Sequence, residues 1–144
     1  MKIIRNSIFI LSCISLFSFN LRNDNNEFHL IFGSGFRNDT VSLEINGIRI
    51  MEDIILQSDT IIGACSTASV HLENGNLFLL NEELQVVKSL PFQYDRELRV
   101  IITINKRPYD LRADLKNGKY MVVSKHWYYY NVYLNQYKKP VSFE

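Results

Sequence analysis

The sequence predicts an all-β domain, an antiparallel β-sandwich with about nine short strands in two packed sheets. Apolar and polar residues alternate with a period of two along most of the chain, as they do on strands that bury one face. Asn-Gly pairs, which readily adopt the positive φ angles of a type I′ turn, separate several of these segments. No convincing helical pattern interrupts them. A closed β-barrel is the alternative, because it also buries one face of alternating strands.

Three Asn-Gly pairs, at 46–47, 74–75 and 117–118, are predicted to close β-hairpins. The segments on either side of them are TVSLEIN and GIRI, ASVHLE and NLFLLN, and YDLRADLK and KYMVVSK. A further turn is predicted at 105–108, with Pro108 at the start of a strand, where its missing N–H is tolerated. Such turns are typical of antiparallel sheets.

The remaining strands are predicted from alternation and residue type. Residues 98–104 and 109–115 alternate over their whole length, and residues 127–137 are predicted to be the last strand. The segment 82–90 could form a short helix, but Val86, Val87 and the following proline favour a strand.

Residues 1–21 have the pattern of a hydrophobic export helix, with Lys2 and Arg5 ahead of an apolar stretch of about 15 residues. A transmembrane helix needs about 20 residues. We expect a cleaved signal peptide first, an uncleaved membrane anchor second, and a lipoprotein acylated at Cys13 third. The predicted organisation is therefore a signal peptide or anchor at 1–21, a polar tether at 22–27 and one β-sandwich domain at 28–144, located in the periplasm, on the cell surface or outside the cell.

Composition and charge exclude several classes of protein. With 47% hydrophobic residues, six glycines and three prolines, the chain is neither collagen-like nor disordered. The 16 Lys and Arg offset 15 Asp and Glu, so no nucleic-acid partner is expected. The charges are nevertheless uneven: residues 23–87 hold ten acids and two bases, and residues 88–144 hold eleven bases and five acids. If the halves occupied different sheets or edges the molecule would be a dipole, but we expect them to interleave.

No metal or cofactor is expected from the motifs. His29, His71 and His126 lack the spacing of metal ligands. The stretches 23–26 and 38–40 contain the oxygen ligands that calcium uses, but such stretches are more typical of turns and tethers.

No catalytic motif is complete either. Residues 33–35, Gly-Ser-Gly, are part of a nucleophile elbow without its full pattern, and a bulge or turn is predicted there. Cys65 is predicted to be a small buried hydrophobic residue, and no third group is indicated that would orient a pair of Cys65 with His71. An enzyme, such as a small hydrolase, is therefore the less favoured interpretation.

The most distinctive feature is the aromatic stretch that begins at His126. If the whole stretch is a strand, alternation turns Tyr128, Tyr130, Val132 and Leu134 toward the core. The other face then carries the candidate ligand-binding residues, which are Trp127, Tyr129, Asn131, Tyr133 and Asn135. Aromatic rings beside amides suit stacking on sugar rings or contact with a protein partner. A strand buried on both faces is the structural alternative.

The sequence is interpreted as a non-catalytic exported binding or assembly module that recognises a glycan or another cell-surface ligand through this aromatic face. The alternative is a protein–protein interaction module or structural protein of the cell envelope. Small exported β-sandwiches with Asn-Gly turns are generically similar to lectin-like and carbohydrate-binding modules, and this resemblance concerns the fold class alone.

Overall fold

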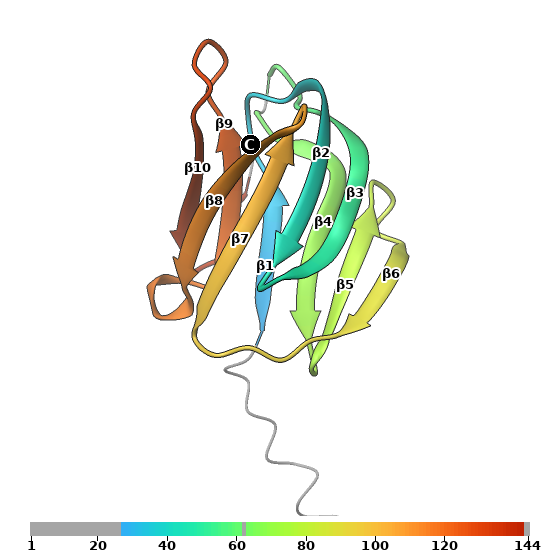
Figure 1. Ribbon diagram of the computed structural model, residues 1–144, viewed down its shortest axis with the longest axis vertical. Coiled ribbons are helices and arrows are strands. Elements are labelled where there is room, and N and C mark those ends of the chain that lie inside the picture. The colour runs from blue at the N-terminus through green and yellow to red at the C-terminus, as the bar shows by residue number, and fades with distance from the viewer. Residues whose placement is uncertain (1–26, 62, 143–144) are drawn as a thin grey trace, which may run out of the picture.

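The computed structural model describes residues 27–61 and 63–142, which form ten strands in two packed sheets (Figure 1). The predicted β-sandwich is confirmed, and the sheets do not close into a barrel. The strands are β1 (Phe28–Phe32), β2 (Arg37–Ile45), β3 (Ile48–Gln57), β4 (Cys65–Glu73), β5 (Asn76–Asn81), β6 (Val86–Pro91), β7 (Glu97–Ile104), β8 (Arg107–Asp114), β9 (Tyr120–Lys125) and β10 (Val132–Tyr137). The predicted export segment lies outside the described residues. Within them, no helix has the length and apolar character to cross a membrane.

The two sheets differ in size. The larger, sheet A, has the strand order β10-β9-β1-β4-β5-β6, and the smaller, sheet B, has the order β3-β2-β7-β8. Neighbouring strands pair antiparallel, with one exception among the described residues: β1 lies parallel to β9, with His29 opposite Tyr120. The parallel pair was not predicted, because it joins the first strand to a segment from the last third of the chain.

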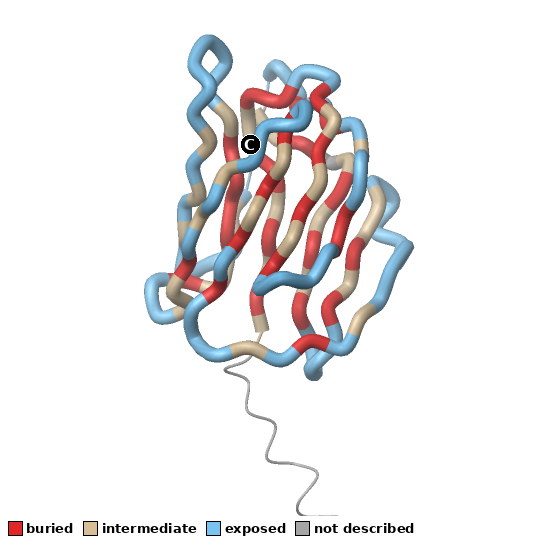
Figure 2. The backbone as a smooth tube through the Cα atoms, viewed as in Figure 1, coloured by how far each residue is buried: buried red, intermediate tan, exposed pale blue. Residues whose placement is uncertain are grey.

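The core lies between the sheets and is built from alternate residues of each strand. In β2 the buried residues are Val41, Leu43 and Ile45, and the residues between them are partly exposed. The same alternation runs along β1 and β7 and is visible as red and tan segments in Figure 2. Cys65 is 5% exposed and faces this core, as predicted.

Two of the three Asn-Gly pairs close hairpins, as predicted. The φ angles are 48° and 81° at 46–47 and 52° and 73° at 74–75, as a type I′ turn requires. A third turn of this kind lies between β7 and β8, where Asn105 and Lys106 adopt φ angles of 49° and 71° without a glycine. Pro108 follows as the second residue of the edge strand β8.

The prediction of a hairpin at Asn117-Gly118 is wrong. Strand β8 belongs to sheet B and β9 to sheet A, so the chain crosses between the sheets at this point. A 3₁₀ turn, Leu115–Asn117, begins the crossing, and the Asp114 side chain accepts a hydrogen bond from the Lys116 N–H. Gly118 serves close packing instead, because a Cβ there would lie 2.4 Å from the backbone of Tyr137.

The segment 82–90 contains the predicted strand only from Val86 onward, and residues 82–85 form a turn that was not predicted. The Asn81 Oδ1 accepts hydrogen bonds from the N–H groups of Glu83 and Gln85, at 3.1 and 2.9 Å, and β6 begins at Val86. The Asn81 side chain therefore holds this turn without a glycine, and Leu84 adopts the positive φ, 59°.

The Gly33-Ser34-Gly35 segment carries the chain from sheet A to sheet B. The register of β1 shifts after Ile31, which agrees with the predicted bulge or turn. The segment then follows β9: the Gly33 N–H donates to the Val123 carbonyl, and the Lys125 N–H donates to the Ser34 carbonyl. Gly35 has a φ of 96°, and a Cβ there would lie 1.6 Å from the Lys125 carbonyl oxygen. The two glycines are therefore explained by the close packing of this segment against β9 and not by a nucleophile elbow.

Gly35→Ala is expected to reduce the free energy of unfolding by at least about 3 kcal/mol, because the methyl group displaces the backbone of β9. Gly47→Ala is the matched control: φ is also positive there, but no atom lies within 4 Å of the new Cβ. Its cost is limited to about 1 to 2 kcal/mol of backbone strain. Urea unfolding followed by tryptophan fluorescence measures both, and equal losses would contradict the close-packing role of Gly35.

Candidate functional site

The aromatic stretch forms a loop that projects from one end of the sandwich between β9 and β10 (Figure 1). The predicted last strand begins at Val132 rather than at Trp127. His126 holds the loop: its N–H donates to the Asn131 carbonyl at 2.9 Å, and its Nδ1 accepts from the N–H groups of Tyr128 and Tyr129 at 3.2 and 3.3 Å. Because the imidazole binds these backbone groups, residues 127–130 do not continue the ladder of β9.

The loop exposes its aromatic side chains on all sides. The exposed fractions are 38% for Trp127, 85% for Tyr128, 65% for Tyr129 and 73% for Tyr130. The predicted burial of Tyr128 and Tyr130 is therefore wrong, because the alternation of a strand does not apply to the loop.

The rest of the alternation holds on β10. Val132 and Leu134 pack against the core, as predicted. The outward residues Tyr133 and Asn135 are exposed, as are Asn131 at the base of the loop and the loop residues Trp127 and Tyr129. The five candidate residues are thus accessible, but Trp127, Tyr129 and Asn131 belong to the loop, whereas Tyr133 and Asn135 lie on the outward face of β10.

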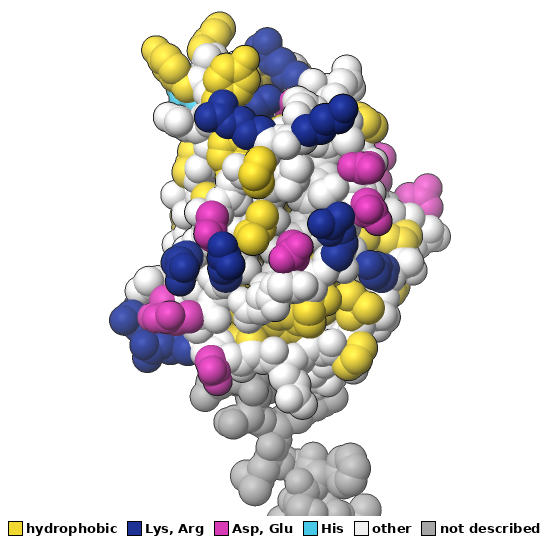
Figure 3. Space-filling model, viewed as in Figure 1, with side chains coloured by type: hydrophobic (Ala, Val, Ile, Leu, Met, Phe, Trp, Pro, Cys, Tyr) yellow, Lys and Arg dark blue, Asp and Glu magenta, His cyan; other side chains and the backbone are white. Residues whose placement is uncertain are grey.

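Two arginines from other strands lie over aromatic rings of the loop, and no pattern in the sequence indicates them. The Arg37 guanidinium carbon lies 3.7 Å from the centroid of the Trp127 ring. The Arg107 guanidinium carbon lies 5.2 Å from the centroid of Tyr130 and 5.6 Å from that of Tyr109. We call the residues Arg37, Lys106, Arg107 and 127–130 the aromatic–arginine end; hydrophobic and basic side chains gather there in Figure 3.

A buried ion pair lies directly beneath this end. Asp39 of β2 is 3% exposed, and both of its carboxylate oxygens accept hydrogen bonds from the Lys125 Nζ of β9 at 2.9 Å. The Asn105 amide donates to the same carboxylate at 2.7 Å, and the Arg37 N–H donates at 2.9 Å. Burial alone raises the pKa of Asp39, but these hydrogen bonds and the charge of Lys125 outweigh it and hold the pKa below its usual value. The carboxylate that calcium would need is therefore bound by a lysine.

We call Asp39 with Asn105, Lys125 and the Arg37 backbone the Asp39 cluster, and every part of the aromatic–arginine end lies next to one of its members in the sequence. Arg37 lies two residues before Asp39, Lys106 and Arg107 follow Asn105, and the loop begins one residue after Lys125. The cluster links sheet A, sheet B and the β7–β8 turn. The arginines, Lys106 and the aromatic loop are thus held in position by a common anchor.

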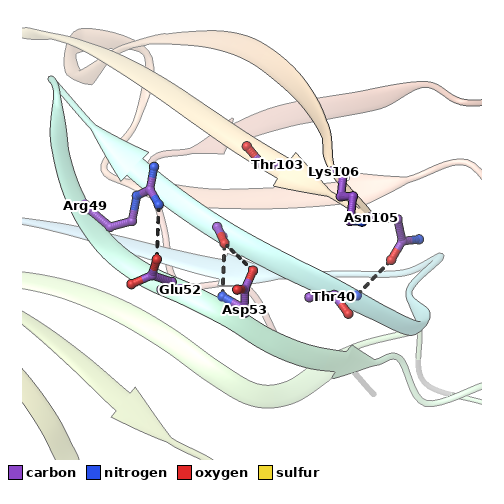
Figure 4. A pocket seen from close by; sticks show the side chains of 8 residues that line it. Thr40, Arg49, Glu52, Asp53, Thr103, Asn105 and Lys106 are labelled. Carbon is purple, nitrogen blue, oxygen red and sulfur yellow. Dashed lines mark hydrogen bonds and ion pairs between the residues drawn. The ribbon is translucent and has the colours of Figure 1, made fainter.

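A polar groove crosses the outer face of sheet B next to this end (Figure 4). Its volume is about 580 Å³, and its lining residues are Thr40, Ser42, Arg49, Glu52, Asp53, Thr103, Asn105 and Lys106. The Asp53 N–H donates to the Ser42 hydroxyl oxygen at 3.0 Å, and Arg49 contacts Glu52 at 3.4 Å. The lining carries hydroxyl, amide and charged groups of both signs but no aromatic ring. Lys106 belongs to both the groove and the aromatic–arginine end.

The outer face of sheet A carries a pair of histidines that sequence reasoning missed. The β1–β4 register places His29 opposite His71, with ring centroids 4.4 Å apart, and Tyr120 stacks on His29 at 5.1 Å. No pattern in the sequence predicts this register. Burial is the largest influence on both groups and lowers their pKa values; the charge of Lys119 adds to it at His29, and the charge of His29 adds to it at His71. Across residues 27–61 and 63–142, no group of three or more His, Cys, Asp or Glu side chains is arranged to hold a metal ion.

Cys65 and His71 do not form a catalytic pair. Both belong to β4, but Cys65 faces the core and its Sγ lies 3.6 Å from the Thr67 hydroxyl. His71 contacts His29 on the outer face of the same sheet. The two side chains thus lie on opposite faces.

Asp39→Asn is expected to reduce the free energy of unfolding by about 3 to 5 kcal/mol, because it leaves the Lys125 ammonium without its charged partner inside the protein. Lys125→Met should cause a loss of similar size. Asp110→Asn is the control, since Asp110 and Arg99 form an exposed pair with side chains 46% and 54% accessible. Denaturant unfolding at neutral pH measures all three, and an Asp39 variant as stable as the Asp110 variant would refute the anchoring role.

The histidine pair is expected to make the protein less stable as the pH falls from about 7 to about 5. The native pKa values lie below the usual 6.5, so the unfolded chain binds protons in this range that the native histidines do not. Replacing both residues by glutamine should flatten this part of the curve of unfolding free energy against pH. Identical curves for the double variant and the wild type would show that the pair contributes nothing to it.

The comparisons with known proteins assign no relative. No protein-family model, no curated protein and no solved structure matches the chain. The chemistry of the sites described above therefore carries the functional inference.

Proposed function

We propose that this protein is a non-catalytic binding module, that its ligand surface is the aromatic–arginine end, and that its ligand is a glycan. The observation that carries this proposal is the exposure of Trp127, Tyr128, Tyr129 and Tyr130 on a single projecting loop. An exposed cluster of large aromatic side chains is unusual on a soluble domain and is typical of interaction sites. Their rings offer flat apolar faces to sugar rings, and the tyrosine hydroxyls offer hydrogen bonds to sugar hydroxyls.

The loop is suited to binding because its shape is set before a ligand arrives. His126 accepts hydrogen bonds from two of its backbone N–H groups, and Arg37 stacks on Trp127. A preordered surface loses less conformational entropy on binding than a flexible one. Asn131, Tyr133 and Asn135 extend the exposed surface along β10 and supply further hydrogen-bonding groups. An exported location, as proposed for residues 1–21, would bring such a surface to extracellular or envelope glycans.

Protein–protein association is the second candidate, and the distribution of charge favours it. Within each sheet, strands from the first half of the chain lie toward one edge and strands from the second half toward the other, instead of mixing fully. Residues 27–87 hold nine acids and two bases, while residues 88–142 hold eleven bases and four acids. The edge strand β6, at the acidic side, also exposes Val86 and Val87, at 56% and 57%. Opposite flanks of two molecules could therefore attract each other.

A glycan array of the wild type and two matched variants tests the proposed function. Trp127→Ala is expected to weaken the strongest signal by about tenfold or more, which is the loss typical of a central aromatic contact. Tyr137→Ala removes a side chain of similar exposure, 42%, from the far end of β10 and should leave binding unchanged. Circular dichroism confirms that both variants fold.

Binding that survives Trp127→Ala, or no glycan signal at all, would refute the proposed function. Light scattering of the wild type then separates the second candidate: assembly that weakens at high salt would support association of the charged flanks.

A further inference from the structure

We infer that the glycan recognised by the aromatic–arginine end is acidic, with carboxylate or sulfate groups on its sugar rings. This inference rests on the proposed function and adds the charge of the ligand to it. Three observations carry it: a cluster of cations at this end without acidic partners among the described residues, the placement of two arginines over aromatic rings, and the polar groove that Lys106 lines.

The cations of this end lack carboxylate partners. Among the described residues, Arg49, Arg96, Arg99, Lys116 and Lys125 form ion pairs, whereas other basic side chains, such as Arg112 of β8, form none. Arg37, Lys106 and Arg107 form none with the residues that the structure describes. Asp39 lies two residues from Arg37, but its carboxylate is buried and already accepts hydrogen bonds from Lys125, Asn105 and the Arg37 backbone. A cluster of three such cations attracts an anionic ligand.

Arg37 lies against the Trp127 ring at stacking distance, and a guanidinium in this position keeps its in-plane hydrogen-bond donors available. Arg37 lies over the Trp127 ring at 3.7 Å and Arg107 over the Tyr130 ring at 5.2 Å. Stacking uses the flat face of a guanidinium, whereas its N–H groups point outward in the plane. Carboxylate and sulfate oxygens accept pairs of such N–H groups in a fixed geometry. Contact with the ring also restrains the long arginine side chain, which lowers the entropy cost of binding.

The groove favours a sugar chain over the other polyanions. Lys106 lines it together with the hydroxyls of Thr40, Ser42 and Thr103. These hydroxyls hydrogen-bond to sugar hydroxyls, and the lining offers no aromatic ring on which the bases of a nucleic acid would stack. The loop residues 127–130 are one tryptophan and three tyrosines, and the tyrosine hydroxyls favour a hydrogen-bonding ligand such as a sugar over the hydrocarbon of a membrane.

The test compares the affinities of the purified full chain for charged and neutral polymers. The probes are polygalacturonate, dextran sulfate and neutral dextran, together with a single-stranded oligothymidylate and vesicles of phosphatidylcholine and phosphatidylglycerol. The variants are the double substitution Arg37→Gln with Arg107→Gln, and Trp127→Ala. Arg112→Gln is the matched control, because Arg112 is an exposed arginine of β8 without an ion pair, away from the loop. Thermal unfolding monitors the fold of each variant.

We expect at least one acidic polymer to bind on the order of tenfold or more tightly than dextran, and the double variant to lose most of this difference. Arg112→Gln should remain within about twofold of the wild type, and Trp127→Ala should weaken every glycan. Binding of the acidic polymer should also weaken at about 1 M salt, where the screening length is about 3 Å.

Each contrary result has a distinct meaning. Equal binding of neutral and acidic glycans that Trp127→Ala abolishes would overturn the acidic ligand and leave the proposed function in place. An equal loss in Arg112→Gln and the double variant would show unspecific attraction and overturn the inference. Tighter binding of the oligonucleotide or of the vesicles would overturn it in favour of those ligands. No binding of any glycan would refute the proposed function itself.

Discussion

The ion pair between Asp39 and Lys125 is the interaction on which the arrangement of this end of the molecule depends. Burying two charges is costly, and the cost is offset only when the hydrogen bonds to both groups are complete. Here the carboxylate accepts from a lysine of sheet A, the amide of Asn105 and a backbone N–H of sheet B. Arg37 is itself one of these donors, Lys106 and Arg107 directly follow Asn105, and the aromatic loop directly follows Lys125. The charged interior of this end and the exposed arginines and aromatic rings above it are therefore linked through the same residues.

Local chemistry predicted the parts of the fold that depend on neighbouring residues. The turns at 46–47 and 74–75 formed because each Asn-Gly pair stands between strands that pair with each other. The pair at 117–118 is also Asn-Gly, but its flanking strands belong to different sheets, which depends on the order of the strands in both sheets. The turn at Asn105-Lys106 succeeds without glycine because the Asn105 side chain accepts the Thr40 N–H and donates to Asp39. Both outcomes depend on contacts distant in sequence.

The candidate site was predictable only in part, for a related reason. The outward residues of β10 follow from alternation, and Trp127 and Tyr129 were correctly expected to be exposed. Alternation failed at Tyr128 and Tyr130 because the His126 ring binds backbone groups that a strand would have used. Arg37 and Arg107 were not predictable, because β2 and β8 bring them to the loop only when the sheets have packed. The aromatic half of the site is therefore visible in a linear sequence, and the cationic half appears only in the fold.

The parallel pairing of β1 with β9 also constrains when this protein can fold. Strand β1 is central in sheet A, yet one of its two partners comes from residues 120–125, near the end of the chain. Contacts between such distant segments form slowly, because a long loop must close before they are made. During synthesis, a chain that still lacks β9 leaves one side of β1 without its hydrogen-bonding partner. The hairpin that completes the large sheet also carries the aromatic loop, so the loop takes its place over Arg37 and Arg107 only when β9 and β10 have joined the sheet.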